Sequence, residues 1–133
     1  MPTHRVLVID DQPHMLMLME VLLQRTFPGV HVMTANSARD ALEMLDMQPC
    51  DLVLSDVNMP HQDGFFILGE VKRRCDSVPV VLMSGTPLNS KASAAGADGF
   101  LLKPFTMQQL AETISTVALA KRDILGTQID VRA

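Results

Sequence analysis

Residues 6–11 read VLVIDD, a short apolar run that ends in two carboxylates. The run does not alternate between apolar and polar side chains, which predicts a strand that is covered on both faces. Two later runs share this pattern: DLVLSD at residues 51–56 ends in a further carboxylate, and VPVVLM at residues 78–83 is followed by the hydroxyl of Ser84. Such strands are typical of a parallel sheet between two layers of helices, so they predict an α/β fold.

The segments between these runs carry helical patterns and turn residues. Helices are expected at residues 13–26, 37–48, 65–75, 88–95 and 106–122, and two more strands at residues 30–33 and 100–102. Strands and helices alternate, so the crossovers are expected to be right-handed. No linker or repeat interrupts the pattern. Residues 1–133 are therefore predicted to form a single domain, with a core of about residues 4–122 and a tail at 123–133.

Composition and charge exclude several classes of protein. Apolar residues make up 47% of the chain and charged residues 20%, which is typical of a globular domain. The net charge is −4, and no clustered basic segment indicates a nucleic-acid-binding face. No apolar run approaches the roughly 18 residues of a membrane span, and the N-terminus lacks a signal-peptide pattern. We expect a cytoplasmic protein that binds neither nucleic acid nor membrane.

Three carboxylates fall at the ends of predicted strands. Asp10 and Asp11 follow the first strand, and Asp56 closes the third. The carboxyl ends of parallel strands share one edge of the sheet, so these side chains are expected to meet in one crevice. Carboxylates that are close together either take up protons or hold a cation. Oxygen ligands without convergent His or Cys favour Mg²⁺, so the sequence predicts a magnesium site.

Two further polar groups are expected at the same edge. Ser84 directly follows the fourth strand, and Lys103 follows the fifth. A carboxylate that attacks a phosphoryl group forms an acyl phosphate. Mg²⁺ and an ammonium group would neutralise charge on the oxygens of the transferring group. The five side chains together therefore indicate a phosphoryl-transfer site.

Five short motifs make the chain resemble the receiver domain of two-component response regulators, the CheY-like family, over about residues 4–122. The motifs are VIDD at 8–11, LSDVNMP at 54–60 with DG at 63–64, MSG at 83–85, AGADGF at 95–100 and KPF at 103–105. Each motif is weak alone, but five in the right order at strand ends are highly specific. The resemblance implies an open doubly wound (βα)5 sandwich of the flavodoxin-like type, with a five-stranded parallel sheet in the order 2-1-3-4-5.

The resemblance also implies the chemistry of the site. Asp56 would be the phosphoacceptor, taking the phosphoryl group from a phosphohistidine on a sensor histidine kinase or a histidine phosphotransfer protein. Asp11, Asp56 and the backbone carbonyl of Asn58 would bind Mg²⁺ directly, with Asp10 helping through water. Apart from this self-catalysed transfer and slow autodephosphorylation, the chain would be a signalling protein and not an enzyme.

Further implied roles concern the response to phosphorylation. Ser84 would hydrogen-bond the phosphoryl oxygens, Lys103 would pair with them, and Phe100 occupies the position of the switch aromatic residue. The Lys103-Pro104 bond resembles one that is cis in the family. Because phosphorylation adds about two negative charges, it favours whichever loop arrangement binds them better. The chain would then signal by contact with an unknown downstream protein, as a monomer or weak homodimer.

Two features depart from the pattern of the family. The segment from Ser84 to Lys103 is about three residues shorter than expected and rich in poor helix formers, so the fourth helix is predicted to be short. The helix at residues 13–26 has almost no polar face. We expect Leu16 and Met17 to form an exposed apolar patch beside the crevice, where the phosphodonor docks.

Three other functions fit parts of the sequence. The main alternative is a pseudo-receiver, which binds proteins on this fold without being phosphorylated. A phosphohydrolase of the haloacid-dehalogenase type would need a second aspartate where this chain has Asn58. A flavin or nucleotide binder would need a phosphate-binding loop rich in Gly, Ser or Thr after the first strand, where this chain has DDQP at residues 10–13.

Overall fold

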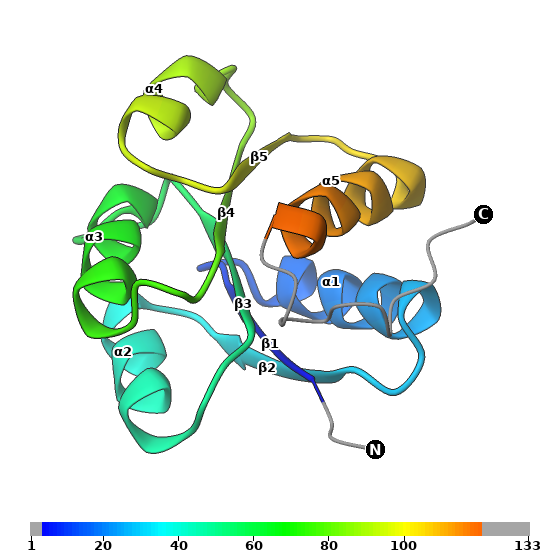
Figure 1. Ribbon diagram of the computed structural model, residues 1–133, viewed down its shortest axis with the longest axis horizontal. Coiled ribbons are helices and arrows are strands. Elements are labelled where there is room, and N and C mark those ends of the chain that lie inside the picture. The colour runs from blue at the N-terminus through cyan, green and yellow to red at the C-terminus, as the bar shows by residue number, and fades with distance from the viewer. Residues whose placement is uncertain (1–3, 121–133) are drawn as a thin grey trace.

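The computed structural model describes residues 4–120, and the side chains through residue 117. Its five parallel strands follow the order β2-β1-β3-β4-β5, with α1 and α5 on one face of the sheet and α2, α3 and α4 on the other (Figure 1). The predicted fold class and strand order are confirmed. The expected tail at residues 123–133 lies outside the described residues, as does the predicted end of the last helix.

The helices and strands lie within two residues of their predicted bounds wherever both ends are described. The strands are β1 (Arg5–Ile9), β2 (His31–Ala35), β3 (Leu52–Asp56), β4 (Val80–Ser84) and β5 (Gly99–Leu102). The helices are α1 (Pro13–Thr26), α2 (Ala38–Met47), α3 (Gly64–Arg74), α4 (Asn89–Ala94) and α5 (Met107–Ala120). α4 has only six residues, so the predicted short fourth helix is confirmed.

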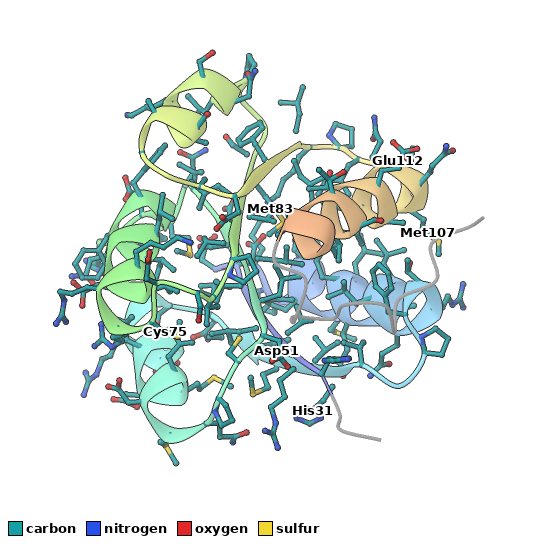
Figure 2. The ribbon with its side chains drawn as sticks, in the orientation of Figure 1. His31, Asp51, Cys75, Met83, Met107 and Glu112 are labelled. Carbon is teal, nitrogen blue, oxygen red and sulfur yellow. The ribbon has the colours of Figure 1, made fainter. Side chains whose placement is uncertain are left out.

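The sheet separates two apolar cores. Successive residues of β1 point to opposite faces, so Val6 and Val8 pack toward α1 and α5 whereas Leu7 and Ile9 pack toward α2 and α3. Met83 in β4 is fully buried, whereas Met107 lies on the outside of α5 (Figure 2). Each buried side chain of this size contributes about 1.5–3 kcal/mol. The two cores fix the position of all five strand ends.

Side-chain caps define where three helices begin. Ser37 Oγ accepts a hydrogen bond from the backbone N–H of Asp40 at 3.1 Å at the start of α2. At α5, Thr106 and Gln109 form a reciprocal pair, in which each side chain accepts from the other's backbone N–H at 3.0 and 2.9 Å. Asp63 caps α3 in the same way. Such caps typically contribute about 1 kcal/mol each.

The prediction of an exposed apolar patch formed by Leu16 and Met17 on α1 is partly wrong. Leu16 is only 8% exposed and packs in the core with Met19 and Leu23, because positions i, i+3 and i+7 share one face of a helix. Met17 is 70% exposed, as expected. The exposed neighbours that extend its surface are Leu18 and Val21, and not Leu16.

None of the described helices combines the length and the apolar character that a membrane crossing needs.

Candidate functional site

The five predicted polar side chains come from four strands that are adjacent in the sheet. Asp10 and Asp11 follow β1, Asp56 is the last residue of β3, Ser84 is the last residue of β4, and Lys103 follows β5. One carboxylate oxygen from each of Asp10, Asp11 and Asp56 lies within 4.8 Å of the others. The parallel strands therefore bring together three carboxylates that are far apart in the sequence, as the strand-end pattern predicted.

Lys103 links two of the three carboxylates. Its Nζ donates to Asp10 Oδ2 at 3.0 Å and to Asp56 Oδ1 at 3.1 Å. The side chain of Asp10 is completely buried, and that of Lys103 is 20% exposed. Both ion pairs therefore lie largely away from water, where a charge without a partner is costly.

Burial and neighbouring charges shift the pKa values of this cluster. Burial raises the pKa of Asp56; the hydrogen bond and charge of Lys103 work against this rise, and the charges of Asp10 and Asp11 add to it. Burial alone would lower the pKa of Lys103, but its bonds to Asp10 and Asp56 outweigh burial and raise the pKa. Lys103 therefore stays charged and places one positive charge beside a cluster of three carboxyl groups.

The carboxylate cluster fits a hard divalent cation. All three side-chain donors are oxygens, which Mg²⁺ prefers. Both oxygens of Asp10 are already engaged, because Oδ1 accepts from the backbone N–H of Gln12 at 3.0 Å and Oδ2 accepts from Lys103. Asp11 is the most accessible of the three. This arrangement suits direct binding by Asp11 and Asp56, with a more distant part for Asp10.

The side chain of Ser84 contacts that of Asn58, which the sequence analysis did not predict. Ser84 is completely buried, and its Oγ accepts hydrogen bonds from Asn58 Nδ2 at 3.3 Å and from the backbone N–H of Thr86 at 3.0 Å. Only the backbone carbonyl of Asn58 was expected to act here. No pattern of spacing or polarity identifies the side-chain contact, because it depends on how the β3–α3 loop bends back toward β4.

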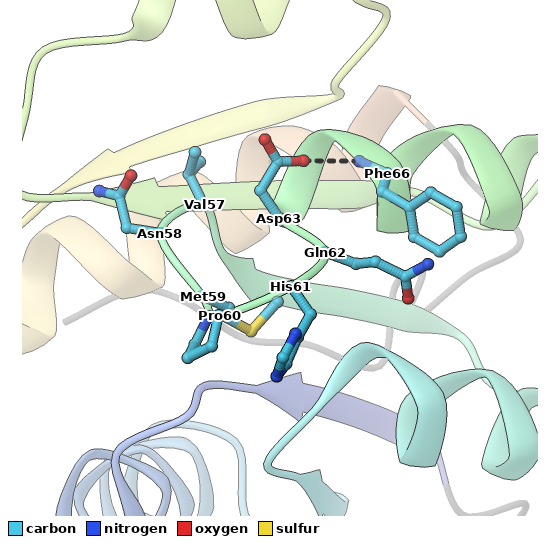
Figure 3. Close-up of a pocket in the computed structure, with 8 residues that line it drawn as sticks. All are labelled: Val57, Asn58, Met59, Pro60, His61, Gln62, Asp63 and Phe66. Atoms are coloured by element: carbon cyan, nitrogen blue, oxygen red, sulfur yellow. Dashed lines mark hydrogen bonds between the residues drawn. The ribbon is translucent and has the colours of Figure 1, made fainter.

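The β3–α3 loop, which begins directly after Asp56, forms an open pocket of about 650 Å³ (Figure 3). The pocket is lined by the loop from Val57 to Asp63 and by Phe66, whose backbone N–H donates to Asp63 Oδ1. His61 has a φ of 71°, in the left-handed region that favours glycine. Gly64 follows the loop, at a position where a Cβ atom would lie 2.6 Å from the backbone oxygen of Asp56, so a larger residue would push against the end of β3.

Strand β5 carries Phe100, and the peptide bond after Lys103 follows it. Phe100 is half-buried in β5 and packs against the core cluster that contains Leu82 and Ala92. The Lys103-Pro104 peptide bond is cis. The backbone N–H of Lys103 donates to the carbonyl of Ser84 at 2.8 Å, which ties the start of this segment to the end of β4.

A doubly wound parallel sheet with a lysine-paired cluster of carboxylates at its carboxyl edge is the arrangement that the resemblance to receiver domains predicted. The sequence model of the family "Response regulator receiver domain" matches residues 6–115. The chain belongs to this family, whose members are signalling proteins that partner histidine kinases.

Curated relatives are similar over most of this chain. It is 40% identical to the two-component response regulator ARR11 of Arabidopsis thaliana over 111 residues, which cover 80% of this chain and 21% of that protein. It is 36% identical to ARR2 of the same plant over 124 residues, which cover 90% of this chain and 18% of that protein. The chain spans about a fifth of the length of these relatives.

Solved structures of receivers superimpose closely on the fold. A receiver domain protein from Clostridium thermocellum is 30% identical with a TM-score of 0.81, covering 89% of this chain and 96% of that one. The chemotaxis response regulator CheY4 of Vibrio cholerae is 30% identical with a TM-score of 0.78, at coverages of 87% and 99%. TrrA of Thermotoga maritima, solved in complex with Mg²⁺-BeF, is 28% identical with a TM-score of 0.78, at coverages of 86% and 99%.

Proposed function

We propose that this chain accepts a phosphoryl group on Asp56, with Mg²⁺, from a phosphohistidine of a sensor histidine kinase or a histidine phosphotransfer protein. The observation that supports this most directly is the Lys103 ammonium, which bridges Asp10 and Asp56 inside the carboxylate cluster. The cluster combines a nucleophile, a fixed cation and oxygen donors for a metal. A pseudo-receiver would need none of these groups.

The transfer follows from the positions of these side chains. A carboxylate oxygen of Asp56 attacks phosphorus, and the bond from phosphorus to the histidine nitrogen breaks, leaving the electron pair on the imidazole. The Lys103 Nζ, now held against Asp56, pairs with the oxygens of the transferred group. Asp11, Asp56 and the backbone carbonyl of Asn58 would hold the metal, with Asp10 acting through water. When bound, Mg²⁺ would neutralise charge on the transferring oxygens.

Signalling would follow from a shift between two loop arrangements. The Ser84 hydroxyl would bind a phosphoryl oxygen, and Phe100 would repack in response. Moving a two-state population from 1% to 99% needs about 5.5 kcal/mol of differential binding. One hydroxyl bond and one ion pair supply only part of this, so we expect a graded shift. The output is contact with a downstream protein, made by a cytoplasmic monomer or weak homodimer.

The phosphodonor would dock on the exposed face of α1. This helix begins at Pro13, directly after the carboxylates, and Met17 stands one turn into it. Met17, Leu18 and Val21 form the exposed apolar surface there. Replacing Met17 with Glu should slow transfer from a phosphorylated histidine phosphotransfer domain but not from acetyl phosphate. Equal slowing with both donors would place the defect in the phosphorylation site.

Labelling with acetyl phosphate tests the phosphoacceptor. In the presence of Mg²⁺, mass spectrometry should show one added phosphoryl group on the wild-type chain and none on Asp56→Asn. EDTA should prevent labelling, because the metal would then be absent. A chain that keeps its fold but takes up no phosphoryl group would be a pseudo-receiver, and an adduct that survives in D56N would mean a different acceptor.

A further inference from the structure

Strand β2 forms one edge of the sheet, with α1 and α2 on either side of it (Figure 1). Its inner side is paired with β1 along its whole length, from His31 to Ala35. Its outer side has no neighbouring strand among residues 4–120. An edge strand presents backbone N–H and C=O groups that can pair with a further strand. The outer side of β2 is therefore a place where another chain can extend the sheet.

The pairing with β1 fixes which backbone groups of β2 face outward. Along a parallel strand, successive residues direct their N–H and C=O groups to opposite sides. The N–H of His31 and the carbonyl of Ala35 both bond toward the β1 side of the sheet, at 2.8 and 3.1 Å. The backbone groups of Val32 and Thr34 therefore point outward. Neither residue makes a further backbone hydrogen bond in the described part of the chain.

A groove of about 390 Å³ lies beside the carboxyl end of this open edge. It is lined by Thr34, Ala35 and Asn36 from the sheet edge, by Leu16 from α1, and by Asp40, Glu43, Met44 and Met47 from α2. The four α2 residues are spaced i, i+3, i+4 and i+7, so they form one stripe along the helix. The outward-facing backbone of Thr34 is therefore bordered by a helix face that is partly apolar and partly acidic.

The α2 stripe indicates which side chains a bound segment would carry. Met47 is 79% exposed, more than any other large apolar side chain in the described part of the chain. Asp40 forms no ion pair within that part, and Glu43 has only a 3.6 Å contact with the exposed Arg39. A methionine face beside two carboxylates is complementary to basic side chains with long apolar stems.

We propose that the outer edge of β2 is a docking site for an extended segment of a partner protein, in which basic and apolar side chains alternate. The segment adds a strand to the sheet and pairs with the N–H and C=O groups of Val32 and Thr34. Its basic side chains face α2, where their stems cover Met47 and their charges meet Asp40. Its apolar side chains face the other side of the added strand, toward Leu16 of α1.

Fluorescence anisotropy with a labelled heptapeptide of alternating lysine and valine tests the site. The wild type should bind it about tenfold more tightly than a peptide in which glutamate replaces lysine, because two carboxylates line the groove. Glu43→Lys should weaken binding of the lysine peptide about two- to fivefold. Glu112→Lys is the matched control, since it makes the same change on the exposed side of α5 (Figure 2) and should bind like the wild type. Equal weakening by both variants would ascribe binding to net charge and overturn the proposal.

Backbone methylation of the peptide separates strand addition from a contact through side chains alone. Only alternate N–H groups of an added strand face β2. N-methylation of one alternate set should therefore lower the affinity about tenfold or more, because several hydrogen bonds are lost. N-methylation of the other set should leave the affinity within about twofold of the unmodified peptide. Two methylated peptides that bind equally well would refute pairing with β2.

Thr34→Pro tests the same pairing from the side of the protein. Proline removes the outward N–H of residue 34 but no bond to β1, and edge strands tolerate proline at such positions. T34P should bind the lysine peptide about tenfold more weakly, whereas Thr34→Ala keeps the N–H and should bind like the wild type. Equal binding by the two variants would contradict the proposal. Circular dichroism checks the fold, and if T34P does not fold, the methylated peptides decide the question.

Sedimentation velocity distinguishes a partner segment from a second copy of this chain. A monomer that binds the lysine peptide supports the proposal. A dimer that T34P dissociates and the peptide cannot enter would mean that two β2 edges pair with each other, which would overturn it. Binding is measured without Mg²⁺ or a phosphodonor, so the result does not depend on whether Asp56 accepts a phosphoryl group.

Discussion

Replacing Lys103 with Met should show how strongly the site depends on its internal cation. The change keeps the length and apolar stem of the side chain but leaves Asp10 and Asp56 without the ammonium that lies 3.0 and 3.1 Å from them. Each pair contributes roughly 5 kcal/mol of Coulomb attraction at an effective dielectric constant of about 20, before the cost of desolvation. Removing one partner from a buried pair costs about 3–5 kcal/mol. Because Lys103 is 20% exposed, we expect a loss of about 3 kcal/mol.

Urea unfolding at pH 7, in EDTA and in millimolar Mg²⁺, measures this loss. Mg²⁺ should restore part of the stability of K103M, because the metal supplies positive charge to the same carboxylates. Lys72→Met is the matched control: Lys72 pairs with Asp98 at 2.7 Å between α3 and the start of β5, away from the carboxylates. K72M should be less stable than the wild type, and Mg²⁺ should stabilise it no more than it stabilises the wild type. Equal rescue of both variants would refute the reasoning.

The pH dependence of K103M gives an independent check. Burial already raises the pKa of Asp56 above its ordinary value of 3.8, and removing the ammonium raises it further. At pH values between the ordinary pKa of 3.8 and the raised pKa of Asp56 in folded K103M, the folded protein binds more protons than the unfolded chain. The stability of K103M therefore increases as the pH falls through this range. The deficit of K103M relative to the wild type should therefore shrink as the pH is lowered from 7 toward 4. A deficit that stays constant over this range would contradict the assignment to charge.

Three further variants or reagents test local features. His61→Gly should raise the free energy of unfolding by about 0.5–1 kcal/mol in urea, because glycine adopts a φ of 71° without the cost that histidine bears; lower stability would exclude strain there. Gly64→Ala should cost about 1–3 kcal/mol and slow labelling by acetyl phosphate, since its Cβ would lie 2.6 Å from the Asp56 backbone oxygen; unchanged stability and labelling would refute this. Iodoacetamide at pH 8 should alkylate exposed Cys75 alone, because burial raises the pKa of the Cys50 thiol to about 11; two rapid adducts by mass spectrometry would disagree.

The acidic site was predictable because it depends on strand ends. Uninterrupted apolar runs such as residues 6–9 identify buried parallel strands, and parallel strands present their carboxyl ends at one edge. Asp10, Asp11 and Asp56 then had to meet, whatever the exact bounds of the elements. The bounds themselves depend on pairing: β2 continues to Ala35 because that residue pairs with Ile9 of β1, which its own sequence does not reveal.

Two features were not accessible from the sequence, for different physical reasons. Leu16 was placed on the wrong face because α1 is apolar nearly all round, and its pattern leaves the rotation about the helix axis undefined. The packing of Met19 and Leu23 against the sheet selects that rotation and buries Leu16 with them. The contact of Asn58 with Ser84 arises from the path of a loop, where no periodicity applies.

The burial of strand β3 bears on which parts of the protein are expected to move if Asp56 is phosphorylated. All five of its residues are buried, and it is paired on one side with β1 and on the other with β4. A phosphoryl group on Asp56, as proposed, would thus be attached to a strand that is buried and paired on both sides. We therefore expect the proposed response to phosphorylation to move the loops at the carboxyl edge of the sheet, and not the strand itself.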